Sequence, residues 1–461
     1  MKFAQGTALY LQLYAALVGE IRAQRLSAGE RLPSKRALAA HLAVSVNTVD
    51  AAYQMLVAEG YVQARAKSGF YVSRLQGFPA QNKRPPQDAS AGTNAVQRAA
   101  APYRWQFGTG SVDTGLFPYK VWGRIAREVF SGHPELLNHG ERQGDANLRG
   151  AVAEYLREYR AVSCDAGQII IGAGIEYLLG LLAHLLNGTC VAVEDPGYAR
   201  ARRVLHCNGV RTVAVPLDES GLCVSALEQS GAAAAYITPS HQFPSGIAMP
   251  IGRRLALLEW ARAAKGRYLI EDDYDSEFRF DGRPLPALQG LDESGCAVYI
   301  GTFSKSVAPS IRIGYMVLPP ALLARYHKEL SFYSSTVSRF EQQTLFRFIS
   351  EGHFARHLAR LRIAYRQRRD ELAAALCRAF GKKAAVETAH TGLHLLLRIQ
   401  NGKTEAEILA LCENAGIKIT PLSEYYSVPT SDNQPVFVLG FAGLSGKELN
   451  AAANALANAV L

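Results

Sequence analysis

The stretch GTFSKSVAPSIRIGY, residues 301–315, sets a lysine among small hydroxyl residues and places an arginine seven positions after it. Lys305 is suited to form a Schiff base with an aldehyde. Thr302, Ser304 and Arg312 are suited to hold a phosphate beside it through hydroxyl donors and a charged fork. A serine–lysine pair alone occurs by chance in many chains, so the interpretation depends on the surrounding sequence.

A pair of carboxylates precedes this lysine. The run YLIEDDYDSEF, residues 268–278, places Asp272 and Asp273 at the end of a predicted strand. A pyridinium nitrogen needs a carboxylate to keep its proton and act as an electron sink. Tyr274 is placed to hydrogen-bond a hydroxyl on the same ring. The alternative for the two aspartates is a solvated loop.

Around these motifs, short β-rich runs alternate with helical segments from Trp105 onward. This alternation predicts an α/β fold with a parallel-rich, helix-covered sheet. The last 130 or so residues predict a smaller α+β lobe. The expected strands lie in 168–174, 189–196, 232–240, 266–274 and 296–304, and the expected helices in 178–186, 198–209 and 253–265.

The N-terminal segment has a different pattern. Apolar residues at helical spacing predict a helix over 8–24. Ser34 is a suitable N-cap for a helix over 35–43, and Ser45 for one over 46–60. Two β-rich runs around Lys67–Gly69 predict a hairpin. Together these elements predict a winged helix-turn-helix.

Positive charge is concentrated in the same segment. The chain has a net charge of +10, and residues 1–75 hold nine basic and four acidic residues. A compact basic segment indicates nucleic-acid binding, although a solvated basic face is the alternative. The candidate DNA-binding residues are Lys35, Arg36, Ser45, Asn47, Thr48, Lys67 and Gly69.

The composition also predicts domain limits and location. We expect a winged-helix domain over 1–75, a flexible linker over 76–103, rich in proline and small polar residues, and a large domain over 104–461. The seven cysteines are scattered and form no CxxC pair, which indicates reduced thiols and no metal site. No apolar stretch is long enough to span a membrane, and no signal peptide is evident, so we expect a cytoplasmic protein.

The segment from Leu9 to Val72 resembles the winged helix of the GntR superfamily, through RLPSKRALAAHLAVSVNTVDAAYQMLVAEGYV and KSGFYV. The resemblance implies that the helix after Ser45 enters the major groove of double-stranded DNA. That family often has arginine where this chain has Val46.

The large domain resembles fold type I pyridoxal-phosphate enzymes of the aspartate aminotransferase group. In IIIGAGIEYLLGLL, the residues Gly174, Ile175 and Glu176 would offer backbone N–H groups to the phosphate. In VEDPGY, Tyr198 would stack on the pyridine ring. In PSHQFPSG the usual asparagine is missing, and His241 and Gln242 are the candidate cofactor contacts there.

A GntR-type winged helix, a linker and an aminotransferase-like domain in one chain resemble the MocR family of transcriptional regulators. The resemblance implies a head-to-tail homodimer that senses pyridoxal phosphate, an amino compound, or both. The genes controlled would belong to vitamin B6, amino-acid or amine metabolism. His139 stands where aminotransferases bring a tyrosine to the partner's phosphate, so that contact differs here.

Two functions remain open at this point. One is a regulator whose aminotransferase-like domain is a sensor, and the other is an active aminotransferase with a DNA-binding accessory domain. Aminotransferases of this fold usually clamp the substrate carboxylate with an arginine near the C-terminus, where this chain has Val438. The missing clamp favours the sensor. Arg200 is a candidate for an acidic group of an effector, and a surface charge on a helix is the alternative.

Overall fold

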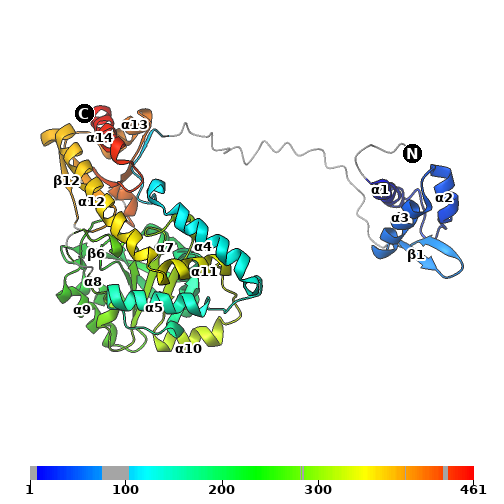
Figure 1. The fold of residues 1–461 in the computed structure, drawn as a ribbon, viewed down its shortest axis with the longest axis horizontal. Coiled ribbons are helices and arrows are strands. Elements are labelled where there is room, and N and C mark those ends of the chain that lie inside the picture. The colour runs from blue at the N-terminus through cyan, green and yellow to red at the C-terminus, as the bar shows by residue number, and fades with distance from the viewer. Residues whose placement is uncertain (1–7, 75–102, 281, 283–284, 390, 429–433) are drawn as a thin grey trace. The chain divides into compact units, whose positions relative to one another are not determined.

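The computed structural model describes residues 8–74, 103–280, 282, 285–389, 391–428 and 434–461. The chain divides into two compact units, Met1–Arg98 and Ala99–Leu461, and each is described by itself (Figure 1). The predicted linker over 76–103 lies outside the described residues, apart from residue 103.

The N-terminal unit is the predicted winged helix, with three helices followed by an antiparallel hairpin. Ser34 Oγ accepts a hydrogen bond from the backbone N–H of Ala37, and Ser45 Oγ accepts one from that of Thr48, each at 3.1 Å. Both predicted N-caps are therefore confirmed. The elements are α1 (Leu9–Arg22), α2 (Lys35–Leu42), α3 (Val46–Ala58), β1 (Val62–Arg65) and β2 (Gly69–Val72).

The large unit is built on an eight-stranded sheet in the order β4-β11-β10-β9-β8-β5-β6-β7. The pairs from β10 through β9, β8 and β5 to β6 are parallel. The five strands expected from the sequence are all present. The strands are β4 (Ile169–Gly172), β5 (Cys190–Asp195), β6 (Arg211–Asp218), β7 (Gly221–Leu222), β8 (Ala234–Ile237), β9 (Tyr268–Asp273), β10 (Ala297–Thr302) and β11 (Gly314–Val317).

The sheet is mixed, since β11 runs antiparallel to both β10 and β4. The sequence alone does not predict this strand. The connection from β10 to β11 spans 303–313, which is shorter than a crossover helix requires, and its length favours an antiparallel return. A buried strand is apolar on both faces, so its direction cannot be read from its residues.

Helices cover both faces of this sheet. Ile169 and Ile171 of β4 pack with α4, α5 and α11, whereas Ile170 packs with α6 and α10 on the opposite face. The alternation follows from the two-residue period of a strand. The helices of this lobe are α4 (Tyr119–Gly132), α5 (Ala146–Arg160), α6 (Ile175–Leu185), α7 (Ala199–Cys207), α8 (Val224–Gln229), α9 (Ile251–Arg262), α10 (Pro320–Glu329) and α11 (Arg339–Ser350).

The expected smaller lobe has its own core around an antiparallel sheet in the order β12-β13-β16-β15. The long helix α12 joins the lobes, because Phe354 packs in the large core and Leu372 in the small one (Figure 1). A short parallel pair, β3 with β14, is also present. The elements are α12 (His353–Phe380), α13 (Glu405–Asn414), α14 (Gly446–Val460), β3 (Trp105–Gln106), β12 (Ala384–Glu387), β13 (His394–Ile399), β14 (Ile417–Lys418), β15 (Thr420–Pro421) and β16 (Val436–Gly440).

Within the part of the chain that is described, no helix is long and apolar enough to cross a membrane. The same residues contain no group of three histidine, cysteine or acidic side chains that could hold a metal ion.

Candidate cofactor pocket and DNA-binding surface

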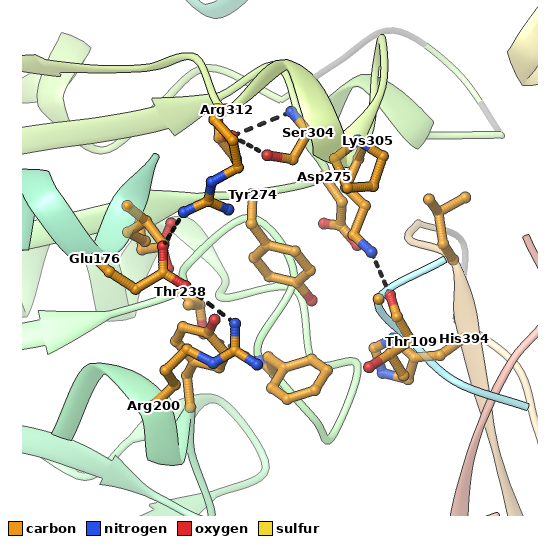
Figure 2. A pocket seen from close by; sticks show the side chains of 18 residues that line it. Thr109, Glu176, Arg200, Thr238, Tyr274, Asp275, Ser304, Lys305, Arg312 and His394 are labelled. Carbon is orange, nitrogen blue, oxygen red and sulfur yellow. Dashed lines mark hydrogen bonds and ion pairs between the residues drawn. The ribbon is translucent and has the colours of Figure 1, made fainter. Parts of the chain in front are cut away.

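A cavity of about 290 Å³ lies where the carboxyl ends of β8, β9 and β10 meet the amino ends of α6 and α7 (Figure 2). The carboxyl edge of parallel strands is where ligands bind in open α/β sheets. The lining residues are Thr109, Gly110, Ile175, Glu176, Tyr198, Arg200, Thr238, Phe243, Asp272, Tyr274, Asp275, Thr302, Ser304, Lys305, Pro309, Arg312, Leu393 and His394.

Lys305 enters the cavity from the loop after β10. Its Nζ donates a hydrogen bond to the carbonyl oxygen of Thr109. Burial lowers the pKa of Lys305 to about 8, and the neighbouring Asp275 carboxylate partly opposes that shift. A lysine with this pKa is partly neutral near pH 7, which is the form that attacks a carbonyl carbon.

Asp272 lies at the end of β9 and is buried. Its Oδ2 accepts a hydrogen bond from the hydroxyl of Tyr236, whereas its Oδ1 has no hydrogen-bond partner among the described residues. Burial raises the pKa of Asp272 to about 7. A buried carboxylate oxygen that faces a cavity and has no protein partner can accept a hydrogen bond from an N–H group of a ligand.

The part of the cavity beside Arg312 is suited to an anion. Gly174 is the N-cap of α6 with φ of +88°, and a Cβ there would stand 2.5 Å from Arg312 Nη2. The positive φ favours glycine, and an added Cβ would displace the Arg312 guanidinium. Thr302 and Ser304 line this end, with their hydroxyl oxygens 2.8 Å apart. Backbone N–H groups at a helix N-terminus attract a phosphate.

One acidic side chain shares this anion-binding end. Glu176 Oε2 lies 2.7 Å from Arg312 Nη2, and its Oε1 lies 3.0 Å from Arg200 Nη1. Figure 2 shows the carboxylate between the two guanidinium groups. Arg200 therefore lines the cavity and pairs with Glu176, with 65% of its side chain exposed.

Tyr274 is held from behind by a buried pair. Its hydroxyl oxygen lies 2.9 Å from His241 Nδ1, and that nitrogen lies 3.0 Å from Asp275 Oδ2. Tyr274 and Asp275 line the cavity, whereas His241 does not. His241 is thus placed to orient Tyr274 and Asp275.

Aromatic rings and one imidazole form the rest of the wall. Phe243 contacts Tyr198, Tyr274 and His394 at ring-centroid distances of 6.0, 5.8 and 5.4 Å. Burial lowers the pKa of His394 to about 3, so its ring is neutral.

The cavity brings together most of the site residues predicted from the sequence. Three are not on its wall: Gly174, which adjoins Arg312, His241, which lies behind Tyr274, and Gln242. Gln242 Nε2 donates to the carbonyl oxygens of Pro196 and Phe243, and this bonding directs the amide away from the cavity.

Other wall residues are absent from the prediction. Asp275 stands one residue after a predicted contact, and Thr238 directly follows β8. Both lie just beyond the carboxyl end of a predicted strand, and this position could have indicated them as cavity residues. Thr109 and His394 come from distant segments and carried no local signal. Val438, at the expected position of the carboxylate clamp, is fully buried in β16.

The DNA-binding candidates differ in their availability. Arg36, Asn47 and Lys67 are exposed, and Lys67 has φ of +59° at the tip of the hairpin. Lys35 pairs with Asp50. The hydroxyls of Ser45 and Thr48 lie 2.8 Å apart at the start of α3, and a Cβ at Gly69 would stand 3.3 Å from Arg31 Nε. Capping and packing therefore account for part of this set.

The large domain fits pyridoxal phosphate on the evidence of its own atoms. The unpartnered Asp272 Oδ1 suits the pyridinium N–H, Arg312 beside Gly174 suits a phosphate, and Lys305 lines the same cavity. These features stand at different parts of one cavity, as a ring with a phosphate and an aldehyde requires.

Comparison with known families agrees with this architecture. Residues 9–72 match the family described as bacterial regulatory proteins, gntR family, and residues 106–456 match aminotransferase class I and II. The large domain also superposes on an archaeal alanine:glyoxylate aminotransferase with a TM-score of 0.70 and 23% identity, over 79% of this chain and 92% of that one. The protein is thus a winged-helix DNA-binding unit fused to a domain with the fold of the pyridoxal-phosphate aminotransferases.

Relatives that match nearly the whole chain, across both the winged helix and the aminotransferase-like domain, define the family more narrowly. The chain is 38% identical to the HTH-type transcriptional regulator YdeL of Bacillus subtilis, over 96% of this chain and 94% of that one. It is 34% identical to the probable rhizopine catabolism regulatory protein MocR of Rhizobium meliloti, over 98% and 94%. The chain belongs to this MocR-type family of transcriptional regulators.

Proposed function

We propose that this protein binds pyridoxal phosphate in the cavity at Lys305 and uses the large domain as a sensor that controls promoter binding by the winged helix. The observation that carries the proposal is that Lys305, Asp272 with its unpartnered oxygen, and Arg312 all line one cavity. We expect such a regulator to act in the cytoplasm, where it would meet its promoter.

Each residue has a distinct task in this proposal. When bound, the cofactor supplies an aldehyde that condenses with a primary amine and a ring that withdraws electrons. Asp272 would hold the proton of the ring nitrogen, and Tyr198 would pack against the ring. Arg312, Ser304 and the N-terminus of α6 would hold the phosphate.

The proposed effector is an amino compound, or the cofactor itself. Arg200 lines the cavity with 65% of its side chain exposed, so it is available to an acidic group. The C-terminal clamp is absent, because Val438 is buried and apolar. A substrate α-carboxylate would therefore lack its bidentate partner, which supports sensing over rapid transamination.

We also propose a head-to-tail homodimer. Phe130 in α4 and Leu137 just beyond it are 73% and 78% exposed. Large apolar side chains left exposed within one short stretch of the chain are typical of an association surface. Sedimentation of Phe130→Lys beside the wild type measures this, and an unchanged dimer fraction would exclude this surface.

The test of the function combines two measurements on the full chain. Adding pyridoxal phosphate is expected to produce a visible absorption band that Lys305→Ala lacks. Promoter binding is then measured with a panel of amino acids, amines and taurine. Promoter affinity that no compound and no cofactor changes, together with multiple turnovers in a transamination assay, would establish the aminotransferase instead.

A further inference from the structure

The phosphate end of the cavity contains a negative charge of its own. Glu176 is the second residue of α6, and its carboxylate is shared by Arg312 and Arg200 at 2.7 and 3.0 Å. The Glu176 side chain is 30% exposed and lines the cavity together with both arginines (Figure 2).

This carboxylate is ionised at neutral pH. Burial raises the pKa of Glu176, but hydrogen bonds from Arg312, from its own backbone N–H and from Arg200 more than offset that effect and hold the pKa below its ordinary value. A phosphate at the same helix N-terminus carries a charge of about −1.5 to −2 and needs the same donors. Glu176 therefore competes with a phosphate for Arg312 and repels it.

Arg200 limits this competition. Its guanidinium holds Glu176 Oε1, so part of the carboxylate charge is neutralised on the side away from Arg312. Any acidic ligand that engages Arg200 withdraws this partner and leaves Glu176 to act on Arg312 alone. The residue assigned to the effector and the residue assigned to the phosphate are thus joined through one carboxylate.

We propose that Glu176 couples the two ends of the cavity, so that an acidic group bound at Arg200 weakens the hold of Arg312 on the cofactor phosphate. The proposal rests on the proposed function, because it takes pyridoxal phosphate as the ligand. Glu176 keeps cofactor binding reversible and responsive, which a sensor requires and a resident prosthetic group does not.

The test is a double-mutant cycle on the full-length protein, with pyridoxal phosphate affinity measured by titration. Glu176→Gln is expected to bind pyridoxal phosphate about three- to tenfold more tightly, from the loss of one partly buried like charge. Arg200→Ala is expected to bind it less tightly by a similar factor. In the Glu176→Gln background, Arg200→Ala is expected to lower the logarithm of the pyridoxal phosphate affinity by at most about half as much as it does in the wild type, because the coupling carboxylate is gone.

Two controls assign the effect to the phosphate and to Arg200. Pyridoxal, which lacks the phosphate, is expected to bind Glu176→Gln and the wild type equally. Arg203→Ala removes the same charge from an exposed position of α7 outside the cavity and is expected to leave affinity unchanged. Glu176→Ala is a second variant with the same expected direction, should Glu176→Gln fold poorly.

The outcomes separate this inference from the proposed function. A wild type that shows no saturable binding of pyridoxal phosphate would overturn both. A wild type that binds it, with a Glu176→Gln variant that binds equally or more weakly, would overturn only the role of Glu176. Additive effects of the two substitutions would overturn the coupling.

Discussion

Asp272 and Asp273 are neighbours in β9, and their side chains serve opposite faces of the sheet. Each has one oxygen, Oδ1, with no hydrogen-bond partner among the described residues, but only Asp272 lines the cavity. Asp273 Oδ2 receives a hydrogen bond from Arg160 Nε at 2.7 Å in the interior. The alternation of side chains along a strand produces this division. Only the Asp272 carboxylate can therefore meet a ligand in the cavity, whereas the Asp273 carboxylate is part of the core.

The two aspartates should respond differently to the same substitution. Asp272→Asn is expected to weaken pyridoxal phosphate binding about tenfold or more with little loss of thermal stability, because Oδ1 has no protein partner to lose. Asp273→Asn is expected to destabilise the fold by about 3–5 kcal/mol, because it leaves the buried Arg160 uncompensated. Titration and thermal melting measure the two effects. A destabilised Asp272→Asn variant, or an Asp273→Asn variant that is stable but binds the cofactor weakly, would contradict these roles.

The lowered pKa of Lys305 predicts how cofactor capture depends on pH. An ordinary lysine loses its proton near pH 10.5, whereas Lys305 does so at about 8, because burial disfavours its charged form. The neutral amine is the reactive form, so the rate of capture should rise as pH increases through about 8 and level off above it. Stopped-flow absorbance from pH 6.5 to 9.5 measures this rate. Lys305→Ala is the control, and a rate that still rises steeply up to pH 9.5 would show that the pKa of the lysine is not perturbed.

Gly174 predicts a steric effect on the anion-binding end. Gly174→Ala is expected to displace Arg312, because the added Cβ would meet Nη2 at 2.5 Å, and to lower pyridoxal phosphate affinity about tenfold or more. Gly188→Ala is the matched control. Gly188 has φ of +82° against +88° for Gly174, but nothing lies within 4 Å of its added Cβ. Equal affinity losses in the two variants would attribute the effect to backbone strain instead of to Arg312.

The sequence predicts much of this site because its signals are local. Lys305, Thr302 and Ser304 stand within four positions of one strand end, and the period of β9 separates Asp272 from its neighbour. The winged helix is predicted for the same reason, since Ser34 and Ser45 cap adjacent helices in the order of the chain.

The features of the site that could not be predicted from the sequence depend on contacts between distant parts of the chain. Thr109 and His394 reach the cavity from segments about 200 residues before and 90 residues after Lys305, so no spacing indicates them. The sharing of Glu176 between two arginines is a side-chain arrangement that only the folded chain shows. Gln242 carries a polar group suited to a cofactor, but the carbonyls of Pro196 and Phe243 take its hydrogen bonds.

In the winged helix, Arg36 is expected to contact DNA. Arg36→Ala should weaken promoter binding, and a loss of about one unit in the slope of log affinity against log salt would indicate a phosphate contact. Arg25→Ala is the control, because Arg25 is an exposed arginine of the same unit that pairs with Glu20 at 2.6 Å. Fluorescence anisotropy at several salt concentrations measures both variants. Equal losses of promoter affinity in the two variants would show that Arg36 acts only through the net charge of the unit.

The sensor function finally requires that the two units influence each other. A ligand shifts promoter affinity only if it binds the DNA-competent arrangement with a different affinity from the other arrangement. Reciprocity then requires promoter DNA to change pyridoxal phosphate affinity by the same factor, typically through about 1–3 kcal/mol of coupling. The measurement is pyridoxal phosphate titration with and without a promoter fragment, beside promoter binding with and without the cofactor. A chain that lacks residues 1–75 is the control, and its cofactor affinity should not respond to DNA. If DNA leaves the cofactor affinity of the full chain unchanged and the cofactor leaves its promoter affinity unchanged, the cofactor is not the sensed ligand. The same four titrations with an amino compound, at saturating cofactor, then decide whether the large domain senses that compound instead.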